Sequence, residues 1–311
     1  MIVVFGSMNV DLLVTVDKLP RPGETVLTPD YVLVPGGKGG NQACAAARAA
    51  GEAAQVHMIG RVGPDDWGPI ATGMMEAAGV DVRRIAKGTK PTACALIWID
   101  KAGENAIVVA SGANLEATAD QVPDALLGPG TRVVLQAEVP VEQNWALIER
   151  AHGAGAQVIL NVAPACPVPP ATLGKVGVLV VNEIEAAMVA ESEGLPTGGG
   201  PEALARELSG QHGLTCVVTL GGDGAIAVAP DGAWRVAALP VTPVDTTGAG
   251  DAFTGCLAAA LDRGESMAEA LRWASVGAAL ACLTVGCQSA YVAGDEIAAR
   301  LAELPPAAAL A

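Results

Sequence analysis

The stretch VDTTGAGDAFTG, residues 244–255, places a short glycine-rich turn at the start of an apolar helix. The carboxylate of Asp251 falls in the first turn of that helix. Glycines allow backbone N–H groups to approach an anion closely, and a helix N-terminus adds about half a positive charge. The pattern therefore predicts an anion site with a carboxylate held beside it.

Asp251 has two interpretations at this point. The helix dipole alone favours an acidic residue at a helix start. Alternatively, Asp251 is a general base that removes the proton of a hydroxyl group while that group attacks a phosphoryl group. The other motifs of the chain favour the second interpretation.

Composition and charge restrict the class of protein. Of the 311 residues, 51% are hydrophobic and 3% are aromatic, and the net charge is −15. An acidic chain without a basic cluster is a poor match for nucleic acid. Seven single cysteines, with no C-x-x-C pair and no recognisable signal peptide, indicate free thiols in the cytoplasm. The most apolar stretch, 268–287, contains Glu269 and Arg272, so we expect a buried helix there and no membrane span.

The order of strands and helices predicts an α/β fold. The apolar run 2–5 is typical of a strand buried on both faces, and the short segments 56–59 and 132–136 are also expected to be strands. From residue 131 onward, strands and helices alternate, which predicts a doubly wound, mostly parallel sheet. We expect the fold to end at Leu304-Pro305-Pro306, with an Ala-rich tail after it.

Two early segments do not fit this alternation. Residues 12–16, 25–34, 93–99 and 106–109 have the short alternating patterns of strands. We therefore expect a single domain over residues 1–311, with a small β appendage made of segments 12–34 and 92–109.

A glycine block, PGGKGGNQA, follows one of these strands and opens a helix at residues 35–43. It is neither a Walker A loop nor a dinucleotide fingerprint. One interpretation is a flexible loop; the other is a polar site where glycine amides and Asn41 bind a sugar. Asp11 lies after the first strand, where α/β sheets bind ligands. Asp11 and Asn9 could bind sugar hydroxyls, and Asp11 and Glu138 could equally be polar loop residues.

Two more segments lie at expected strand ends. Asn182 and Glu185 have the spacing of a capping box, and the same pair could hold phosphates through Mg²⁺ and water. The TLGGDG segment, residues 219–224, could be a hairpin turn or could line the phosphates and ribose of a nucleotide. Position 253 is Phe, so the Gly248 turn lacks the third glycine of a dinucleotide-binding dehydrogenase.

Together, the GGKGxNQA block, the N-x-x-E pair, TLGxxG and the DTxxAGD-like stretch resemble the ribokinase branch of the ribokinase-like carbohydrate kinases. Their order and spacing match over residues 1–295. The resemblance implies a three-layer α/β/α sandwich whose mostly parallel sheet carries a β lid, formed here by segments 12–34 and 92–109. It also implies a homodimer joined through the lids.

The resemblance assigns a role to each motif. Asp251 resembles the base, and Gly248, Ala249 and Gly250 resemble the anion hole. The sugar contacts implied are Asn9, Asp11, Gly37, Lys38, Gly39, Gly40, Asn41 and Glu138. The ATP contacts implied are Asn182, Thr219, Leu220, Gly221, Gly222, Asp223, Gly224, Gly250 and Ser275. Glu185 is implied to act near Mg²⁺, and the positions implied for K⁺ are Asp245, Thr247, Ala281, Thr284, Gly286 and Ala290.

Three positions depart from the family's pattern. Gly40 replaces a usual Ala. Position 275, commonly Asn or His near adenine, is Ser. The usual Q-P-S segment reads Gln288-Ser289-Ala290, so the hydroxyl at 290 is missing from the implied K⁺ site.

We therefore expect an enzyme that transfers phosphate from ATP to O5 of D-ribose. One alternative is a related kinase for deoxyribose, a nucleoside or a hexose. The other is a catalytically silent protein that binds a sugar or a nucleotide. Asp251 beside an intact glycine turn argues against the silent protein, because a binder needs no base at a phosphate site.

Overall fold

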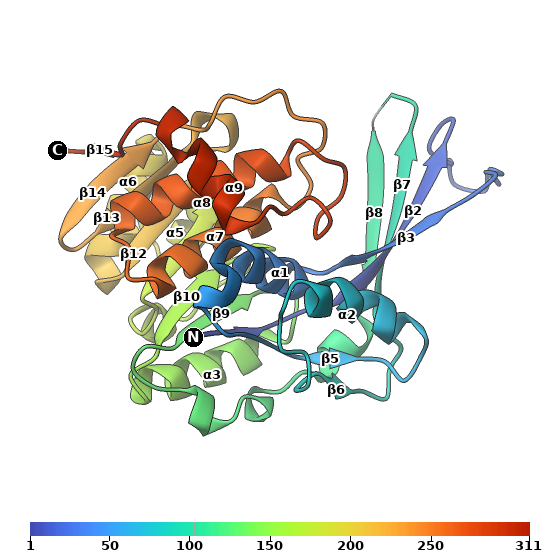
Figure 1. Cartoon of the computed structure of the whole chain (residues 1–311), viewed down its shortest axis with the longest axis horizontal. Coiled ribbons are helices and arrows are strands. Elements are labelled where there is room, and N and C mark those ends of the chain that lie inside the picture. Colours follow the sequence, from blue (N-terminus) through green and yellow to red (C-terminus); the bar gives the residue numbers. More distant parts are fainter. Residues whose placement is uncertain (103) are drawn as a thin grey trace.

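The computed structural model describes residues 1–102 and 104–311. Within them, the central sheet has nine strands in the order β15-β14-β13-β12-β11-β10-β9-β1-β4 (Figure 1). Neighbours from β4 to β12 pair in parallel, which confirms the mostly parallel sheet. These strands are β1 (Ile2–Phe5), β4 (Val56–Ile59), β9 (Arg132–Gln136), β10 (Gln157–Asn161), β11 (Val178–Asn182) and β12 (Thr215–Thr219).

The far edge of the sheet is antiparallel. There β13 (Ala225–Ala229), β14 (Gly232–Val236) and β15 (Ala308–Ala309) extend it. We did not expect β14, and the prediction that the fold ends at Pro306 was wrong, because the Ala-rich tail pairs with β14. Alanine is depleted in strands, so a two-residue pairing through Ala308 and Ala309 leaves no pattern in the sequence.

Helices cover both faces of the sheet, so the three-layer expectation is confirmed. Alternate residues of one strand point to opposite faces: Val4 packs into one apolar core and Val3 into the other. The first core is covered by α1 (Lys38–Ala50), α2 (Trp67–Ala77), α7 (Ala249–Asp262), α8 (Met267–Ala281) and α9 (Gly294–Arg300). The second is covered by α3 (Val141–Gly153), α4 (Pro170–Leu173), α5 (Glu183–Ser192) and α6 (Gly200–His212).

Helices α1 and α7 approach each other unusually closely. A Cβ atom on Gly255 would lie 2.6 Å from the Cβ of Ala45 and 2.6 Å from the backbone oxygen of Gln42. Only glycine fits at this position, and small residues on α1 complete the contact. The glycine that closes the 244–255 stretch therefore sets the distance between the two helices.

A second sheet projects from the body of the molecule (Figure 1). Its order, counting only the described residues, is β3-β2-β7-β8. The strands are β2 (Asn9–Val16), β3 (Val32–Gly36), β7 (Ala93–Asp100) and β8 (Asn105–Ala110). Because β2 pairs in parallel with β7, two distant segments build it, as expected. Gly103, inside the expected segment 92–109, lies outside the described residues.

One expected strand is much shorter than its pattern. The alternation over 25–34 predicted a strand, but only Val32 to Val34 of that range are extended in β3. Pro29 lacks the N–H needed for a ladder hydrogen bond, which accounts for the late start.

The remaining elements are short. They are the strand pair β5 (Arg61–Val62) and β6 (Ala86–Lys87), and the 3₁₀ turns η1 (Gly51–Ala53), η2 (Gly112–Glu116), η3 (Ala119–Gln121), η4 (Asp124–Leu126), η5 (Gly221–Asp223) and η6 (Leu301–Glu303). Over residues 1–102 and 104–311, every helix is too short or too polar to span a bilayer.

Candidate active site

The site forms where the carboxyl ends of the parallel strands meet the first turns of α1 and α7. Asp251 lies there with 7% of its surface exposed. Its Oδ2 accepts a hydrogen bond of 3.0 Å from Asn41 Nδ2, and its Oδ1 accepts one of 2.9 Å from Gln42 Nε2. Two consecutive amides of α1 thus hold both oxygens of a carboxylate on α7.

The glycine block folds back over the end of β1. A Cβ atom on Gly39 would lie 2.7 Å from the backbone of Ser7, and one on Gly37, whose φ is +86°, would lie 2.8 Å from Asn9 N. Both glycines are therefore required by close approach. The block is an ordered segment and not a flexible loop, because Gly40 N donates to Ser7 O at 2.9 Å.

Glu138 joins this segment from the loop after β9. Its Oε2 accepts hydrogen bonds from Ser7 Oγ at 2.6 Å and from the backbone N–H of Lys38 at 3.0 Å. The carboxylate therefore positions the start of α1.

Asp11 lies on β2 with an unusual environment. Burial, together with the nearby carboxylates of Glu138 and Asp251, raises the pKa of Asp11 to about 7. Its Oδ1 is buried without a hydrogen-bond partner among the residues that the structure describes. A buried acceptor of this kind suits hydroxyl donors from a ligand. A Cβ atom on Gly36 would lie 2.3 Å from both Asp11 oxygens, so glycine there makes room for the carboxylate.

Asn9 is held by a residue that the sequence did not point to. Asn114, in η2, donates 2.8 Å from Nδ2 to Asn9 Oδ1 and accepts from Met8 N at 3.1 Å. Both Asn9 and Asn114 are buried. The pair fixes Asn9 so that its own amide N–H groups are available to a ligand.

A cavity of about 160 Å³ opens beside Asp251. It is lined by Lys38, Asn161, Ala163, Val180, Val181, Asn182, Glu185, Thr219, Thr246, Gly248, Ala249, Gly250 and Asp251. Gly248, with a φ of +76°, is the N-cap residue of α7. The first backbone N–H groups of α7 have no partner within the helix, and this end of the helix faces the cavity. The nearby Asp251 is the main cause of a raised pKa of Lys38, with Glu138 and Glu185 contributing. The ammonium and the helix N-terminus together favour an anion there.

The capping-box interpretation of the Asn182–Glu185 pair is confirmed. Asn182 Oδ1 accepts from Glu185 N at 2.8 Å and Asn182 N donates to Glu185 Oε2 at 2.8 Å, as a capping box requires. The same two side chains line the 160 Å³ cavity. Burial raises the pKa of Glu185.

A larger cavity of about 430 Å³ continues from the first and shares Thr219, Thr246, Ala249 and Gly250 with it. Its walls are mostly apolar: Val241, Pro243, Phe253, Ala278 and Ala279 are among them. The hydroxyl of Ser275 is buried there, and over residues 1–102 and 104–311 it has no hydrogen-bond partner.

The TLGGDG segment is the β12–β13 hairpin turn, and it also lines this larger cavity through Thr219, Gly221, Gly222 and Gly224. Leu220 and Asp223 do not line either cavity. Gly224 has a φ of +91°.

The expected K⁺ positions lie in two adjacent loops. Asp245 Oδ1 accepts from Thr247 N and Oδ2 accepts from Gly286 N, both at 2.9 Å. Burial opposes ionisation of Asp245, but the hydrogen bonds from Thr247 and Gly286 leave its pKa lowered overall. The carboxylate thus ties the two loops together. Of the other positions expected to bind K⁺, Ala281 and Ala290 are buried and Thr284 is exposed.

Several buried amides at the site had no role in the sequence analysis. Gln136 Nε2 donates to Gln42 Oε1 at 2.8 Å, and Gln288 Nε2 donates to Asn41 Oδ1 at 3.3 Å. Gln42 directly follows Asn41 in the glycine block, so its place in an Ala-rich helix was a usable signal. Gln136 lies far away in the sequence and leaves no such signal, whereas Gln288 was quoted only as part of the segment beside the implied K⁺ site.

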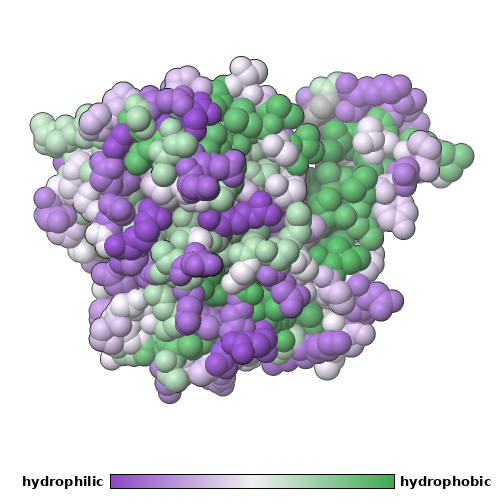
Figure 2. Space-filling view, in the orientation of Figure 1, coloured by the Kyte–Doolittle hydropathy of each residue, from purple (hydrophilic) through white to green (hydrophobic). Residues whose placement is uncertain are grey.

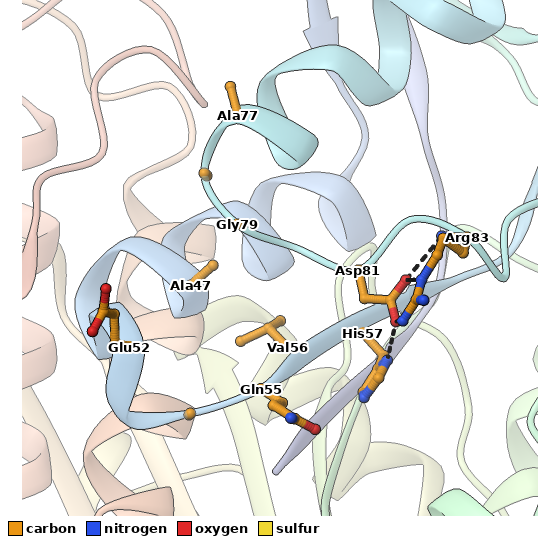
Figure 3. A pocket seen from close by; sticks show the side chains of 12 residues that line it. Ala47, Glu52, Gln55, Val56, His57, Ala77, Gly79, Asp81 and Arg83 are labelled. Carbon is orange, nitrogen blue, oxygen red and sulfur yellow. Dashed lines mark hydrogen bonds and ion pairs between the residues drawn. The ribbon is translucent and has the colours of Figure 1, made fainter.

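A separate cavity of about 560 Å³ contains none of these residues. Figure 3 shows that Asp81 lies between Arg83 and His57 at its edge. The hydrogen bonds from Arg83 keep the pKa of Asp81 below its usual range. The carboxylate of Asp81 is thus paired with Arg83 within the chain.

The chain is similar to known proteins over almost all of its length. Residues 1–293 match the family described as pfkB family carbohydrate kinase. The ribokinase of Bacillus subtilis is 35% identical over 298 residues, covering 95% of this chain and 97% of that protein. Among solved structures, a ribokinase from Thermotoga maritima has a TM-score of 0.88 at 29% identity, covering 97% of this chain and 99% of that one. A ribokinase from Arabidopsis thaliana, in complex with ribose and ATP, has a TM-score of 0.84 at 28% identity, covering 96% and 98%.

The family match spans nearly the whole chain, and the aligned motifs meet around Asp251. The chain belongs to the pfkB family of carbohydrate kinases.

Proposed function

We propose that this enzyme is an ATP-dependent ribokinase, which transfers the γ-phosphoryl group of ATP to O5 of D-ribose. The observation that carries the proposal is the position of Asp251, a buried carboxylate held by Asn41 and Gln42 at the mouth of an anion cavity. The relatives at 30–35% identity that are named ribokinases support ribose as the acceptor.

In this mechanism, ribose lies between β2 and the start of α1. Asp11, Asn9, Asn41 and the backbone of residues 37–40 bind its hydroxyl groups, and Glu138 holds that backbone in place. The O5 hydroxyl gives its proton to Asp251 as the oxygen bonds to the γ-phosphorus of ATP. The bond from that phosphorus to the bridging oxygen breaks, and ADP leaves.

The phosphates lie in the 160 Å³ cavity in this proposal. The N–H groups at Gly248, Ala249 and Gly250, the α7 N-terminus and Lys38 stabilise the charge that develops on the transferring group. The base lies in the 430 Å³ cavity, with Ser275 as its buried hydroxyl contact and the 219–224 turn along the phosphates and ribose.

We propose Mg²⁺ and K⁺ as the metal ions. Glu185 and Asn182 line the phosphate cavity, and one carboxylate together with substrate phosphates is a donor set that Mg²⁺ accepts. Mg²⁺ bound there would neutralise phosphate charge. For K⁺, the proposed ligands are backbone oxygens of the loops around Asp245, Thr247 and Gly286, which the hydrogen bonds to the Asp245 carboxylate join. Backbone oxygens near Ala281, Thr284 and Ala290 are also proposed as ligands.

We also propose that the chain is a single domain in which the β3-β2-β7-β8 sheet acts as a lid, and that two copies dimerise through it. Ile107 and Val108 on β8 are each more than half exposed, and so is Val32 on β3. Figure 2 shows hydrophobic side chains gathered where this sheet projects. We place the enzyme in the cytoplasm, because all seven cysteines are free thiols.

The test is ADP release from ATP and Mg²⁺ over a panel of ribose, deoxyribose, fructose, ribonucleosides and no sugar, with and without K⁺. We expect the highest turnover with ribose and an increase with K⁺. Highest turnover with another acceptor would keep the kinase chemistry and overturn the sugar assignment. Thermal stabilisation by ribose without any ADP release would indicate a silent binding protein.

A further inference from the structure

Gln42 is fully buried on α1 and touches the carboxylate of Asp251 directly. We propose that Gln42 is a positioning residue, which orients Asp251 and stabilises its ionised form through a buried amide network. The proposal rests on the proposed kinase function, in which Asp251 accepts the sugar proton.

The hydrogen bonds leave one orientation for the Gln42 amide. Its Nε2 donates to Asp251 Oδ1 and to Asn161 Oδ1, both at 2.9 Å, and its Oε1 accepts from Gln136 Nε2 at 2.8 Å. Asn161 is itself fixed, because its Nδ2 donates to Val180 O at 3.0 Å. A flipped Gln42 would place an oxygen against a carboxylate, so both N–H groups point to acceptors.

The backbone brings Gln42 to this position. Asp251 and Gly255 are four residues apart on α7 and therefore share one face. Gly255 allows the backbone of α1 to approach at Gln42 and Ala45. This close approach of the two helices thus lies one turn from the carboxylate that Gln42 holds.

The surroundings make this support necessary. Asp251 lies close enough to the carboxylates of Asp11 on β2 and Glu185 on α5, and to the ammonium group of Lys38, to interact with their charges. The nearby Cys287 and Tyr291 have pKa values raised by burial, so they remain neutral. Hydrogen bonds to a charged group favour its ionised form against burial and like charges. Gln42 supplies one of the two that Asp251 receives from side chains of α1.

The first experiment compares Gln42→Met with Gln136→Met. Both replace a fully buried amide of the same network, but only Gln42 contacts Asp251. For Gln42→Met we expect kcat to fall about 10- to 100-fold. We also expect the acidic limb of kcat/KM against pH to move up by about one pH unit. KM for ribose should stay within about 3-fold, and Gln136→Met should leave the acidic limb in place.

A second variant covers the case in which Gln42→Met does not fold. Gln42→Glu preserves the shape, and as a neutral acid it can donate to Asp251 and accept from Gln136. We expect its rate relative to the unmodified enzyme to fall as pH rises, because the new carboxylate ionises beside Asp251.

The outcomes separate the two proposals. An unmodified enzyme that releases no ADP with any sugar overturns the proposed function, and this inference with it. If the unmodified enzyme is active and the acidic limb of kcat/KM is unshifted in both Gln42→Met and Gln136→Met, the inference alone is overturned. The inference is also overturned if the rate of Gln42→Glu relative to the unmodified enzyme does not change with pH.

Discussion

The two ends of the proposed site are built differently. At the sugar end, Asp251, Asn41, Gln42 and Glu138 make direct side-chain hydrogen bonds that join α1, α7 and the strand ends. At the nucleotide end, the cavity is walled mostly by apolar side chains and holds the hydroxyl of Ser275, which has no hydrogen-bond partner among the described residues. A network of hydrogen bonds fixes the orientation of the side chains, whereas an apolar wall mainly removes the surface of a ligand from water. We infer that the sugar end determines the chemistry and that the nucleotide end mostly contributes affinity.

Asp251→Asn is the most severe test of this contrast. The amide cannot accept the hydroxyl proton, so we expect kcat to fall about 10²- to 10⁴-fold. Binding of ribose and ATP, followed by calorimetry, should largely survive. An unchanged kcat would remove Asp251 from the chemistry and with it the claim that the sugar end is the reactive one.

Gly248→Ala and Gly250→Ala form a matched pair at the junction of the two ends. A Cβ atom on Gly248 would lie 2.7 Å from Tyr291 Oη and 2.9 Å from Cys287 Sγ, at a positive φ, whereas one on Gly250 meets no atom within 4 Å. We expect Gly248→Ala to lower kcat about 10- to 100-fold by displacing the N–H groups, as loss of anion-hole donors does. Gly250→Ala should have a clearly smaller effect on kcat. Equal losses in both variants would show that backbone geometry at 248 is not the cause.

Asp11→Asn tests the charge at the sugar end. We expect kcat/KM for ribose to fall about 10- to 100-fold, because a charged acceptor is lost. The raised pKa of Asp11, about 7, also predicts in which direction the stability of the folded state changes with pH. A raised pKa favours the folded state below the ordinary value of 3.8, and this contribution is lost as pH rises toward 7.

This pH dependence of stability can be measured by thermal unfolding. Thermal unfolding of Asp11→Asn should occur at a higher temperature than that of the unmodified enzyme at pH 8, with little difference at pH 4. A constant difference in Tm across this range would contradict the proposed burial of the charge.

Ser275→Ala should have the smallest effect. If burial dominates at the nucleotide end, KM for ATP changes by no more than about 5-fold, the value of one neutral hydrogen bond, and kcat is unaffected. A fall in kcat comparable to that of Gly248→Ala would show that the nucleotide end also sets the chemistry. Ser275→Asn, which restores the side chain common in the family, serves as the companion variant.

The sequence was most informative where one segment carries the whole signal. The strands 56–59 and 132–136 were placed correctly because each is a short, mostly apolar segment. The cap formed by Asn182 and Glu185 follows from their spacing alone. The family resemblance then supplied the fold, and the comparisons confirm it.

Features that depend on distant contacts were not predictable in this way. Asn114 reaches Asn9 across 105 positions, and Gln136 reaches Gln42 across 94. Buried amides of this kind have no periodicity, and their partners are defined only once the sheet is assembled. The pairing of Ala308 and Ala309 with β14 is another example, because two alanines carry no strand preference.

The contact at Gly255 has a consequence for exchanging parts between relatives. Helices α1 and α7 are far apart in the sequence, with Gln42 and Asp251 separated by 209 positions, yet they meet with room for no more than a hydrogen atom. A chimera that takes residues 38–50 from one parent and residues 249–262 from another would join two surfaces not fitted to each other. The two helices therefore form one unit of recombination, and crossover points should keep them from the same parent.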